Sequence, residues 1–233
     1  MPSTYLTRTP SSAGNRKTWT FSAWIKRTEL SSSDWIIRAA PGGGDAGGFY
    51  FPTDNKLAIN LENGGSNVVN LHTTRLFRDI SGYYHIVVRC DTTQATQADR
   101  VRLYVNGVQE TSFSTTLYPS QNLDMAMCKD GAHFIATDGA SSANRWSGIM
   151  SHVHLCDGYS YGADSFGSTD SNGVWKINTS PSVSYGTTGF TILKDGNTIT
   201  DQSSNSNDWT LGGGTLTNMK DCPSNVFATI NPL

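Results

Sequence analysis

Apolar and polar side chains alternate along several short stretches of the chain. In residues 17–28 (KTWTFSAWIKRT), the apolar side chains beginning with Trp19 fall on one face of an extended strand, and polar residues share the other face with Trp24. Residues 82–91 (GYYHIVVRCD) and 99–107 (DRVRLYVNG) alternate in the same way. A period of two residues is typical of a β-strand with one buried face. These stretches therefore predict three strands.

The third stretch ends in Asn106-Gly107, a pair that readily adopts the two positive φ angles of a type I′ turn, so we expect a tight antiparallel hairpin there. No window of the sequence has the periodicity of an amphipathic helix. Short strands separated by turns, about ten in all, predict an all-β fold, a two-sheet antiparallel jelly-roll β-sandwich. The further strands are predicted at residues 34–39, 48–51, 56–61, 67–72, 132–137, 145–157 and 189–193.

The alternation weakens toward the C-terminus, where the sequence becomes rich in Ser, Asn and Gly. We therefore assign residues 1–193 to the sandwich and residues 194–233 to a C-terminal segment that packs partly on it, with Trp209 as its apolar anchor. The final stretch, 224–233 (SNVFATINPL), predicts a short strand along a sheet or in a neighbour's groove. The Gly-rich stretch 41–48 (PGGGDAGG) predicts a flexible loop at an end of the sandwich.

The overall charge narrows the range of partners. Charged residues form 15% of the 233-residue chain and the formal net charge is −2, so the chain lacks the basic field that attracts nucleic acid. No apolar stretch approaches the roughly 20 residues that span a bilayer, and the first residues lack the apolar core of a secretory signal. We therefore expect a soluble protein that binds neither nucleic acid nor membrane. Its four widely spaced cysteines are expected to be buried free thiols.

Six stretches, in this order, carry a family resemblance: RTPSSAGNRKTWTFSAWIKR from Arg8, YYHIVVRCD from Tyr83, RVRLYVNGVQETSF from Arg100, RWSGIMSHVHLCDG from Arg145, SFGSTDSNGVW from Ser165 and DQSSNSNDWT from Asp201. They resemble the concanavalin A-like, laminin-G-like domains of structural proteins of tailed bacteriophages. The strand followed by LYVNG is shared by laminin-G-like domains generally and so supports the fold. The stretch RTPSSAGNRKTW and the Trp-Ser-Gly strand are narrower and resemble the phage branch.

This resemblance implies a virion structural protein that is made in the host cytoplasm and displayed on the exterior of the capsid or tail. A capsid decoration protein is the favoured form, because longer relatives continue beyond the segment that resembles residues 224–233. The implied partners are other virion proteins, with a homo-oligomer expected and a trimer as one arrangement. The alternative is a lectin-like tail-fibre module that binds a glycan of the host surface. A glucan hydrolase is the remote alternative.

Catalysis is not expected, because the carboxylates lack the required arrangement. A retaining glycosidase needs two carboxyl groups about 5–5.5 Å apart, and glucanases of this fold typically use Glu-x-Asp-x-x-Glu. The three glutamates, Glu29, Glu62 and Glu110, are isolated from one another, and most aspartates lie in Asp-Gly turns. The sequence therefore predicts a domain that is not an enzyme.

No metal site or cofactor is expected, although two weak metal candidates exist. His152 and His154 alternate with Cys156 on one predicted strand, but a fourth zinc ligand is not evident, so half-exposed surface residues are the simpler interpretation. Asp201 and Asn205 alternate with other oxygen donors as in a calcium loop. The glycine and glutamate of such a loop are missing, and a turn that seats Trp209 explains the pattern better.

Aromatic residues are the remaining candidates for a contact surface, since aromatic rings bind the apolar faces of sugars and also mark protein interfaces. The alternation assigns Trp19 and Trp146 to the core. The residues predicted to be exposed, for a glycan or a protein partner, are Trp24, Trp35, Tyr50, Tyr118, Tyr159 and Tyr161.

Overall fold

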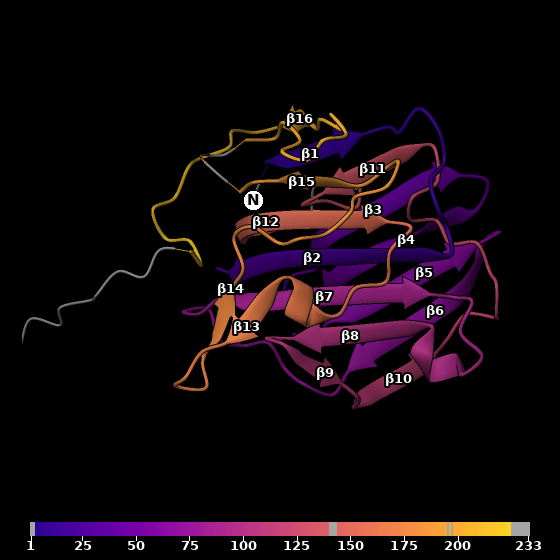
Figure 1. Cartoon of the computed structure of the whole chain (residues 1–233), viewed down its shortest axis with the longest axis horizontal. Coiled ribbons are helices and arrows are strands. Elements are labelled where there is room, and N and C mark those ends of the chain that lie inside the picture. Colours follow the sequence, from indigo (N-terminus) through magenta and orange to yellow (C-terminus); the bar gives the residue numbers. More distant parts are fainter. Residues whose placement is uncertain (1–2, 140–143, 195, 197, 225–233) are drawn as a thin grey trace, which may run out of the picture.

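The computed structural model describes residues 3–139, 144–194, 196 and 198–224. Its strands form two antiparallel sheets stacked as a sandwich, with one small separate hairpin (Figure 1). The predicted all-β antiparallel sandwich is confirmed. The helical segments in these ranges are two 3₁₀ turns, η1 (Gln97–Asp99) and η2 (Ala163–Ser165), and none is long and apolar enough to cross a membrane.

The larger sheet has eight strands and the smaller has six. The eight-stranded order is β10 (Phe113–Leu117), β6 (Ser66–Thr73), β5 (Ala58–Asn63), β4 (Asp45–Phe51), β3 (Asp34–Gly42), β11 (Ala132–Ile135), β1 (Tyr5–Arg8) and β16 (Thr210–Gly213). The six-stranded order is β15 (Phe190–Ile192), β12 (Gly148–Asp157), β2 (Thr18–Arg27), β7 (Tyr84–Asp91), β8 (Val101–Val105) and β9 (Val108–Glu110). The hairpin pairs β13 (Gly167–Thr169) with β14 (Trp175–Ile177).

The apolar core lies between the two sheets. Trp19 and Phe21 of β2 pack against Phe49 of β4, with ring centroids 6.0 and 5.3 Å apart, so the inner faces of the sheets meet directly. Trp19 and Trp146, the two tryptophans that the sequence assigns to the core, are both buried. The cysteines are free thiols as expected, but only three of them are buried, because Cys222 is half-buried.

Glycine turns join the strands, and one of them differs from the prediction. Asn106 and Gly107 connect β8 to β9 with φ angles of 48° and 81°, which confirms the expected hairpin. The prediction of a flexible loop over residues 41–48 is wrong, because β3 runs to Gly42 and β4 begins at Asp45. The turn itself is therefore only two residues long.

Residues 158–188, here called the covering segment, lie over the outer face of the six-stranded sheet. Figure 1 shows β13, β14 and η2 in front of that sheet. A second apolar cluster forms where Phe166 of the covering segment meets Val87 and Cys156 of the sheet. Thr20, which the alternation places on the polar face of β2, is consequently buried as well.

His85 of β7 fixes the covering segment at one point. The Trp175 indole donates a hydrogen bond to Nδ1 of His85 at 3.0 Å, so the proton of the neutral imidazole is on Nε2, which donates to the Ser22 hydroxyl at 2.9 Å. Trp175 also lies against Gly107, where a Cβ would overlap its ring. Burial lowers the pKa of His85 to about 3, so the imidazole is neutral at pH 7.

The C-terminal part of the described chain returns to the larger sheet. β16 pairs with β1 and completes the edge of the eight-stranded sheet. Trp209, immediately before β16, is buried and packs on Phe190 with ring centroids 5.0 Å apart. Apart from Ser224, the strand predicted over residues 224–233 lies outside the described residues.

Candidate functional site

The outer face of the eight-stranded sheet carries outward side chains that are only half-buried. Phe49 and Ile59 of neighbouring strands point into the core, so the residues beside them point outward. We call this surface the open face. It is defined by Trp35, Arg38, Tyr50, Asn60, Asn70 and His72.

An aromatic pair dominates the open face. Trp35 of β3 and Tyr50 of β4 are register partners, and their rings stack with centroids 4.5 Å apart and planes 11° apart. The Arg38 guanidinium lies 5.3 Å from the centre of the Trp35 ring, and its Nη1 donates to the Asp138 carbonyl at 2.7 Å. Trp35 and Tyr50 are two of the six aromatic residues that the sequence singles out. They pack on each other, and the Arg38 guanidinium lies beside the Trp35 ring.

Two amide side chains lie beside the aromatic pair. Asn60 of β5 and Asn70 of β6 are register partners. Burial raises the pKa of the Tyr50 phenol, while a hydrogen bond from the Asn60 side chain acts in the opposite direction. Within the described ranges, the Oδ1 atoms of Asn60 and Asn70 have no hydrogen-bond partner. Both oxygens are buried, so these unused acceptors lie beneath the surface of the open face.

A glycine leaves the centre of the open face without a side chain. Gly48 stands between Arg38 and Asn60 in the register of β3, β4 and β5. A Cβ at this position would overlap the carbonyl of Ile37, so only glycine fits the close approach of the strands. Gly48 itself is buried, so the surface at this position is formed by the flanking side chains, which include Arg38 and Asn60.

His72 of β6 completes this surface. Burial lowers the pKa of its imidazole, so His72 is neutral at pH 7. A neutral imidazole has one nitrogen that donates and one that accepts. The open face therefore presents both donors and acceptors to a ligand, with Arg38 as the only formal charge among its six defining residues.

A second aromatic pair lies on the covering segment. The rings of Tyr159 and Tyr161 stack with centroids 5.6 Å apart and planes 12° apart. The Thr20 hydroxyl donates to the Tyr159 carbonyl and accepts from the Tyr161 amide, both at 2.8 Å, which fixes this pair to β2. Tyr159 is exposed and Tyr161 is half-buried. The pair lies over the six-stranded sheet, so it is separate from the open face.

Two of the aromatic residues predicted to be exposed are not available to a ligand in the same way. The prediction for Trp24 is wrong: its side chain is only 6% exposed and stacks on His85 with ring centroids 4.7 Å apart. The covering segment closes over that face, which the alternation of β2 could not reveal. Tyr118 is half-buried and packs against the core, and burial raises the pKa of its phenol.

The histidines of β12 are buried, so the prediction that they are half-exposed is wrong. A β-bulge between Ser151 and His154, where His152 has a φ of 49°, interrupts the alternation that the sequence suggested. Nδ1 of His154 is 2.9 Å from the Tyr185 hydroxyl, and burial lowers the pKa of His154 to about 3. In the part of the chain that the structure describes, no three His, Cys, Asp or Glu residues are placed to hold a metal ion.

The calcium-like loop is tied into the protein by its own hydrogen bonds. Both carboxylate oxygens of Asp201 accept from backbone or hydroxyl donors, including the amides of Thr191 and Asn207 at 2.9 and 2.8 Å. The side-chain amide of Asn205 donates to the backbone carbonyls of Gly186 and Gly189. These contacts seat the turn before Trp209.

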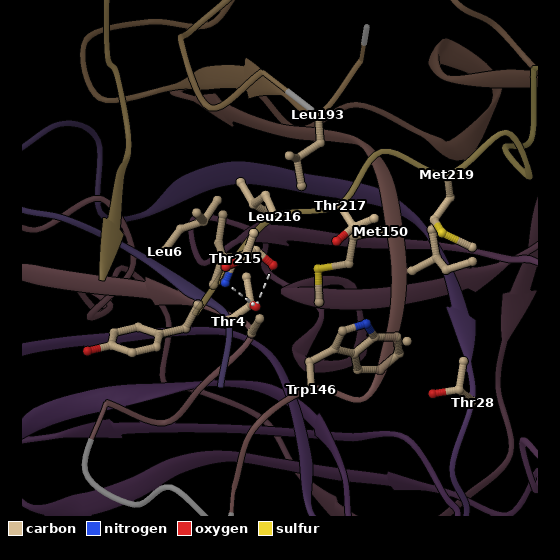
Figure 2. Close-up of a pocket in the computed structure, with 15 residues that line it drawn as sticks. Thr4, Leu6, Thr28, Trp146, Met150, Leu193, Thr215, Leu216, Thr217 and Met219 are labelled. Atoms are coloured by element: carbon tan, nitrogen blue, oxygen red, sulfur yellow. Dashed lines mark hydrogen bonds between the residues drawn. The ribbon is translucent and has the colours of Figure 1, made fainter. Parts of the chain in front are cut away.

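A cavity of about 350 Å³ opens at one edge of the sandwich, between the ends of the two sheets (Figure 2). Its roof is formed by the residues after β16, where Thr4 and Thr215 share two hydrogen bonds of 2.8 and 3.1 Å. Local sequence patterns do not predict this cavity, because its walls come from segments far apart in the chain. The apolar lining includes Leu6, Ile135, Trp146, Met150, Leu193 and Leu216.

A laminin G family model, described as the concanavalin A-like lectin/glucanases superfamily, matches residues 3–159. The chain belongs to this family. In this concanavalin A-like sandwich, the matched residues include the whole open face, whereas most of the covering segment lies beyond them. No curated protein matches the sequence.

Solved structures share the concanavalin A-like fold at low sequence identity. A putative carbohydrate binding protein from Bacteroides ovatus is 15% identical, with a TM-score of 0.55 over 94% of this chain and 58% of its own. A heptameric SAP-like pentraxin from Limulus polyphemus is 17% identical, with a TM-score of 0.50 over 68% of this chain and 71% of its own. At these identities the likeness establishes the fold alone.

The glutamates of this concanavalin A-like domain come from three separate places. Glu110 of β9 forms an ion pair with Arg75 at 2.7 Å. Glu62 is half-buried on β5, and Glu29 is exposed after β2. The sequence prediction of a non-catalytic domain stays a prediction.

Proposed function

We propose that this chain is a carbohydrate-binding module and that the open face receives the glycan. The observation that carries the proposal is the Trp35–Tyr50 stack, fixed beside Arg38 on a sheet face where these side chains are only half-buried. Carbohydrate sites combine aromatic rings with a small number of polar groups that set orientation. Membership of a lectin and glucanase superfamily agrees with this assignment.

The chemistry of the open face suits a pyranose ring. One side of such a ring presents C–H groups, which pack on an aromatic face, and its edge carries hydroxyls that both donate and accept. Tyr50 and Trp35 supply the aromatic contact. Arg38, Asn60 and His72 supply polar groups beside the aromatic pair. Because the pair is already stacked, little side-chain entropy is lost on binding.

A glycan array with the whole chain tests the proposal. We expect selective binding to a subset of bacterial surface polysaccharides, and Trp35→Ala should weaken it at least tenfold, the effect of removing a central aromatic anchor. Tyr159→Ala, which alters the other aromatic stack, is the matched control and should leave the affinity unchanged. Flat binding across the array, or equal losses in both variants, would contradict the proposal.

Binding is proposed to need no metal or other cofactor and to leave the glycan intact. Asp201 and Asn205 are already engaged with protein groups, so dialysis against EDTA should not change the affinity. Incubation with laminarin should release no reducing ends. Calcium-dependent binding would contradict the prediction that no metal is needed. Steady release of reducing ends would contradict the prediction that the glycan stays intact.

A second candidate function is display on the surface of a phage particle, as a capsid decoration protein or tail-fibre part. It is supported by the stretches from Arg8 and Arg145 that resemble the phage branch of the family. In this setting the chain contacts other virion proteins and forms a homo-oligomer, with a trimer as one arrangement. Cryo-electron microscopy of a particle that carries the chain tests the idea, and particles without density for it on capsid or tail would exclude it.

A further inference from the structure

We propose that the cavity in Figure 2 binds a small amphipathic molecule, a medium-chain acyl compound with an aliphatic body and an oxygen acceptor. The cavity lies between the two sheets and shares none of the six residues of the open face. The proposal is therefore independent of the carbohydrate-binding function.

The size and walls of the cavity define the body of the ligand. Its volume of about 350 Å³ is within the usual range for small-molecule sites. An apolar cavity of about 150 Å³ accommodates benzene, so this one has room for roughly twelve to fourteen non-hydrogen atoms. Met150 and Met219 contribute flexible thioether side chains to the walls, which adapt to an aliphatic chain more readily than branched residues do.

One buried donor in the wall requires an acceptor. Trp146 is 5% exposed, and its Nε1 has no hydrogen-bond partner among the described residues. Figure 2 shows this nitrogen on the side of the ring that faces the space between Met150 and Met219. The indole nitrogen can only donate, so a carbonyl or carboxylate oxygen of the ligand satisfies it. Trp19, Trp24 and Trp209 also have buried indole nitrogens without a described partner, but they do not line the cavity.

A polar cavity adjoins the apolar one and provides space for the head of the ligand. It has a volume of about 490 Å³ and shares Met150, Leu193 and Met219 with its neighbour. Its other lining residues include Ser151 and Lys194. Two cavities that share lining residues, one apolar and one polar, match a molecule with an aliphatic body and a polar end.

The roof over both cavities is held at two separated points. Thr4 binds Thr215 at one point. At the other, Lys26 forms an ion pair with Asp221 at 2.7 Å, and the Tyr83 hydroxyl donates to the Asp221 carbonyl at 2.7 Å. The residues between these points cross the cavity, so a ligand enters by displacing this short strap while both sheets stay in place.

Titration of the full chain with decanoate, followed on the ¹⁵N-labelled indole groups, tests the proposal. We expect a saturable downfield shift of the Trp146 indole proton, which is assigned by its absence in Trp146→Phe. Trp146→Phe keeps an apolar wall and removes the donor, so affinity for the decanoate anion measured by calorimetry should fall about tenfold or more, the worth of one hydrogen bond to a charged group. A parallel titration with 1-decanol reports how much the charged head contributes.

Variants that fill the cavity decide whether the ligand is bound there. Met150→Trp should weaken decanoate binding more than tenfold, and Leu216→Trp in the roof serves the same purpose if the first variant fails to fold by circular dichroism. Trp35→Phe on the open face is the control and should bind normally. Undiminished binding in a folded, filled variant would overturn the proposal, as would the absence of binding in the unaltered chain.

The same titration on a chain that ends at Ser224 tests whether residues 225–233, and not a small molecule, occupy the cavity. Ser224 lines the polar cavity, and the nine residues after it include Val226, Phe227 and Ile230. We expect equal decanoate affinity with and without these residues. Binding that appears only in the shortened chain would identify residues 225–233 as the occupant and overturn the assignment to a small molecule.

Discussion

The two outer faces of the sandwich differ in what lies over them. On the six-stranded sheet, the covering segment buries Thr20, Trp24 and His85 and adds a second apolar cluster. On the eight-stranded sheet, Trp35 and Tyr50 stay half-buried and stack on each other. The same alternating pattern is therefore compatible with a closed layer on one side and an accessible surface on the other.

This difference separates structural from functional aromatic residues. An aromatic ring under the covering segment contributes to stability, because its removal leaves a cavity. A ring on the open face buries less area, so its truncation should affect the proposed glycan binding more than the stability. The following substitutions test the contrast, from the largest expected effect on stability to the smallest.

Phe166→Ala should give the largest loss. Phe166 is 1% exposed and joins the covering segment to His154, with ring centroids 5.4 Å apart. Truncation of a fully buried phenylalanine costs about 3–5 kcal/mol of unfolding free energy, to be measured by urea denaturation. Phe134→Ala is the matched control, since Phe134 of β11 points outward beside Arg38 and is half-buried. Equal losses in the two variants would contradict the contrast.

Gly107→Ala should destabilise the covered side by about 2–4 kcal/mol. Gly107 has a φ of 81°, which costs alanine about 1–2 kcal/mol, and the added methyl group would also overlap the Trp175 ring. Gly64→Ala is the control, because Gly64 has a φ of 58° but nothing within 4 Å of the new Cβ. Thermal denaturation of both variants isolates the effect of Trp175, and similar melting temperatures would show that the indole moves aside freely.

Mild acid should lower the free energy of unfolding, because the two histidines on the covered side are buried in their neutral form. Burial lowers the pKa of His85 and His154 to about 3, below the unfolded value of 6.5. As pH falls from 6.5 toward 3, the unfolded chain takes up protons that the folded chain refuses, so stability present above pH 6.5 is progressively lost. The slope is up to about 1.4 kcal/mol per pH unit for each histidine.

Urea denaturation of the unaltered chain and of His85→Gln between pH 6.5 and 4.5 measures this slope. The variant should lose less stability over the interval, because one titrating group is gone. His72→Gln on the open face should reduce the slope less than His85→Gln does, because the pKa of His85 is lowered strongly, to about 3. Identical slopes for all three proteins would show that His85 does not remain neutral in the fold.

Tyr50→Ala should have the smallest effect on stability and a large effect on binding. The stacked pair is worth about 0.5–1.5 kcal/mol beyond the area it buries, and Tyr50 is only half-buried. Differential scanning calorimetry should therefore show a small decrease in melting temperature, while glycan affinity is lost. A loss of stability as large as that of Phe166→Ala would make Tyr50 a structural residue.

The alternation in β2 and β7 was sufficient to predict the sandwich and its inner face. It could not predict which outer face is covered, because the covering residues are 60 or more positions further along the chain and polar enough to resemble a surface loop. The alternation alone therefore places Trp24 on a solvent-exposed face. The bulge at His152 could not be predicted either, because one inserted residue changes the register without producing a recognisable sequence pattern.

The candidate site was partly foreseeable. Trp35 and Tyr50 were singled out as exposed aromatic residues, but only the pairing of β3 with β4 brings them together. Arg38, Asn60 and Gly48 carry no signal in the sequence, because only the cross-strand register places them beside the aromatic pair. The cavity beside Trp146 depends on contacts between distant segments, which local patterns do not encode.

The position of β1 affects how the protein is made. Residues 5–8 leave the ribosome well before their partners in the sheet, which are residues 132–135 and 210–213. At about 5–20 residues per second, roughly 6–25 s pass before the first partner is synthesised. During that interval the strand Tyr5–Arg8 has neither neighbour, so β1 can join the sheet only after translation passes β11.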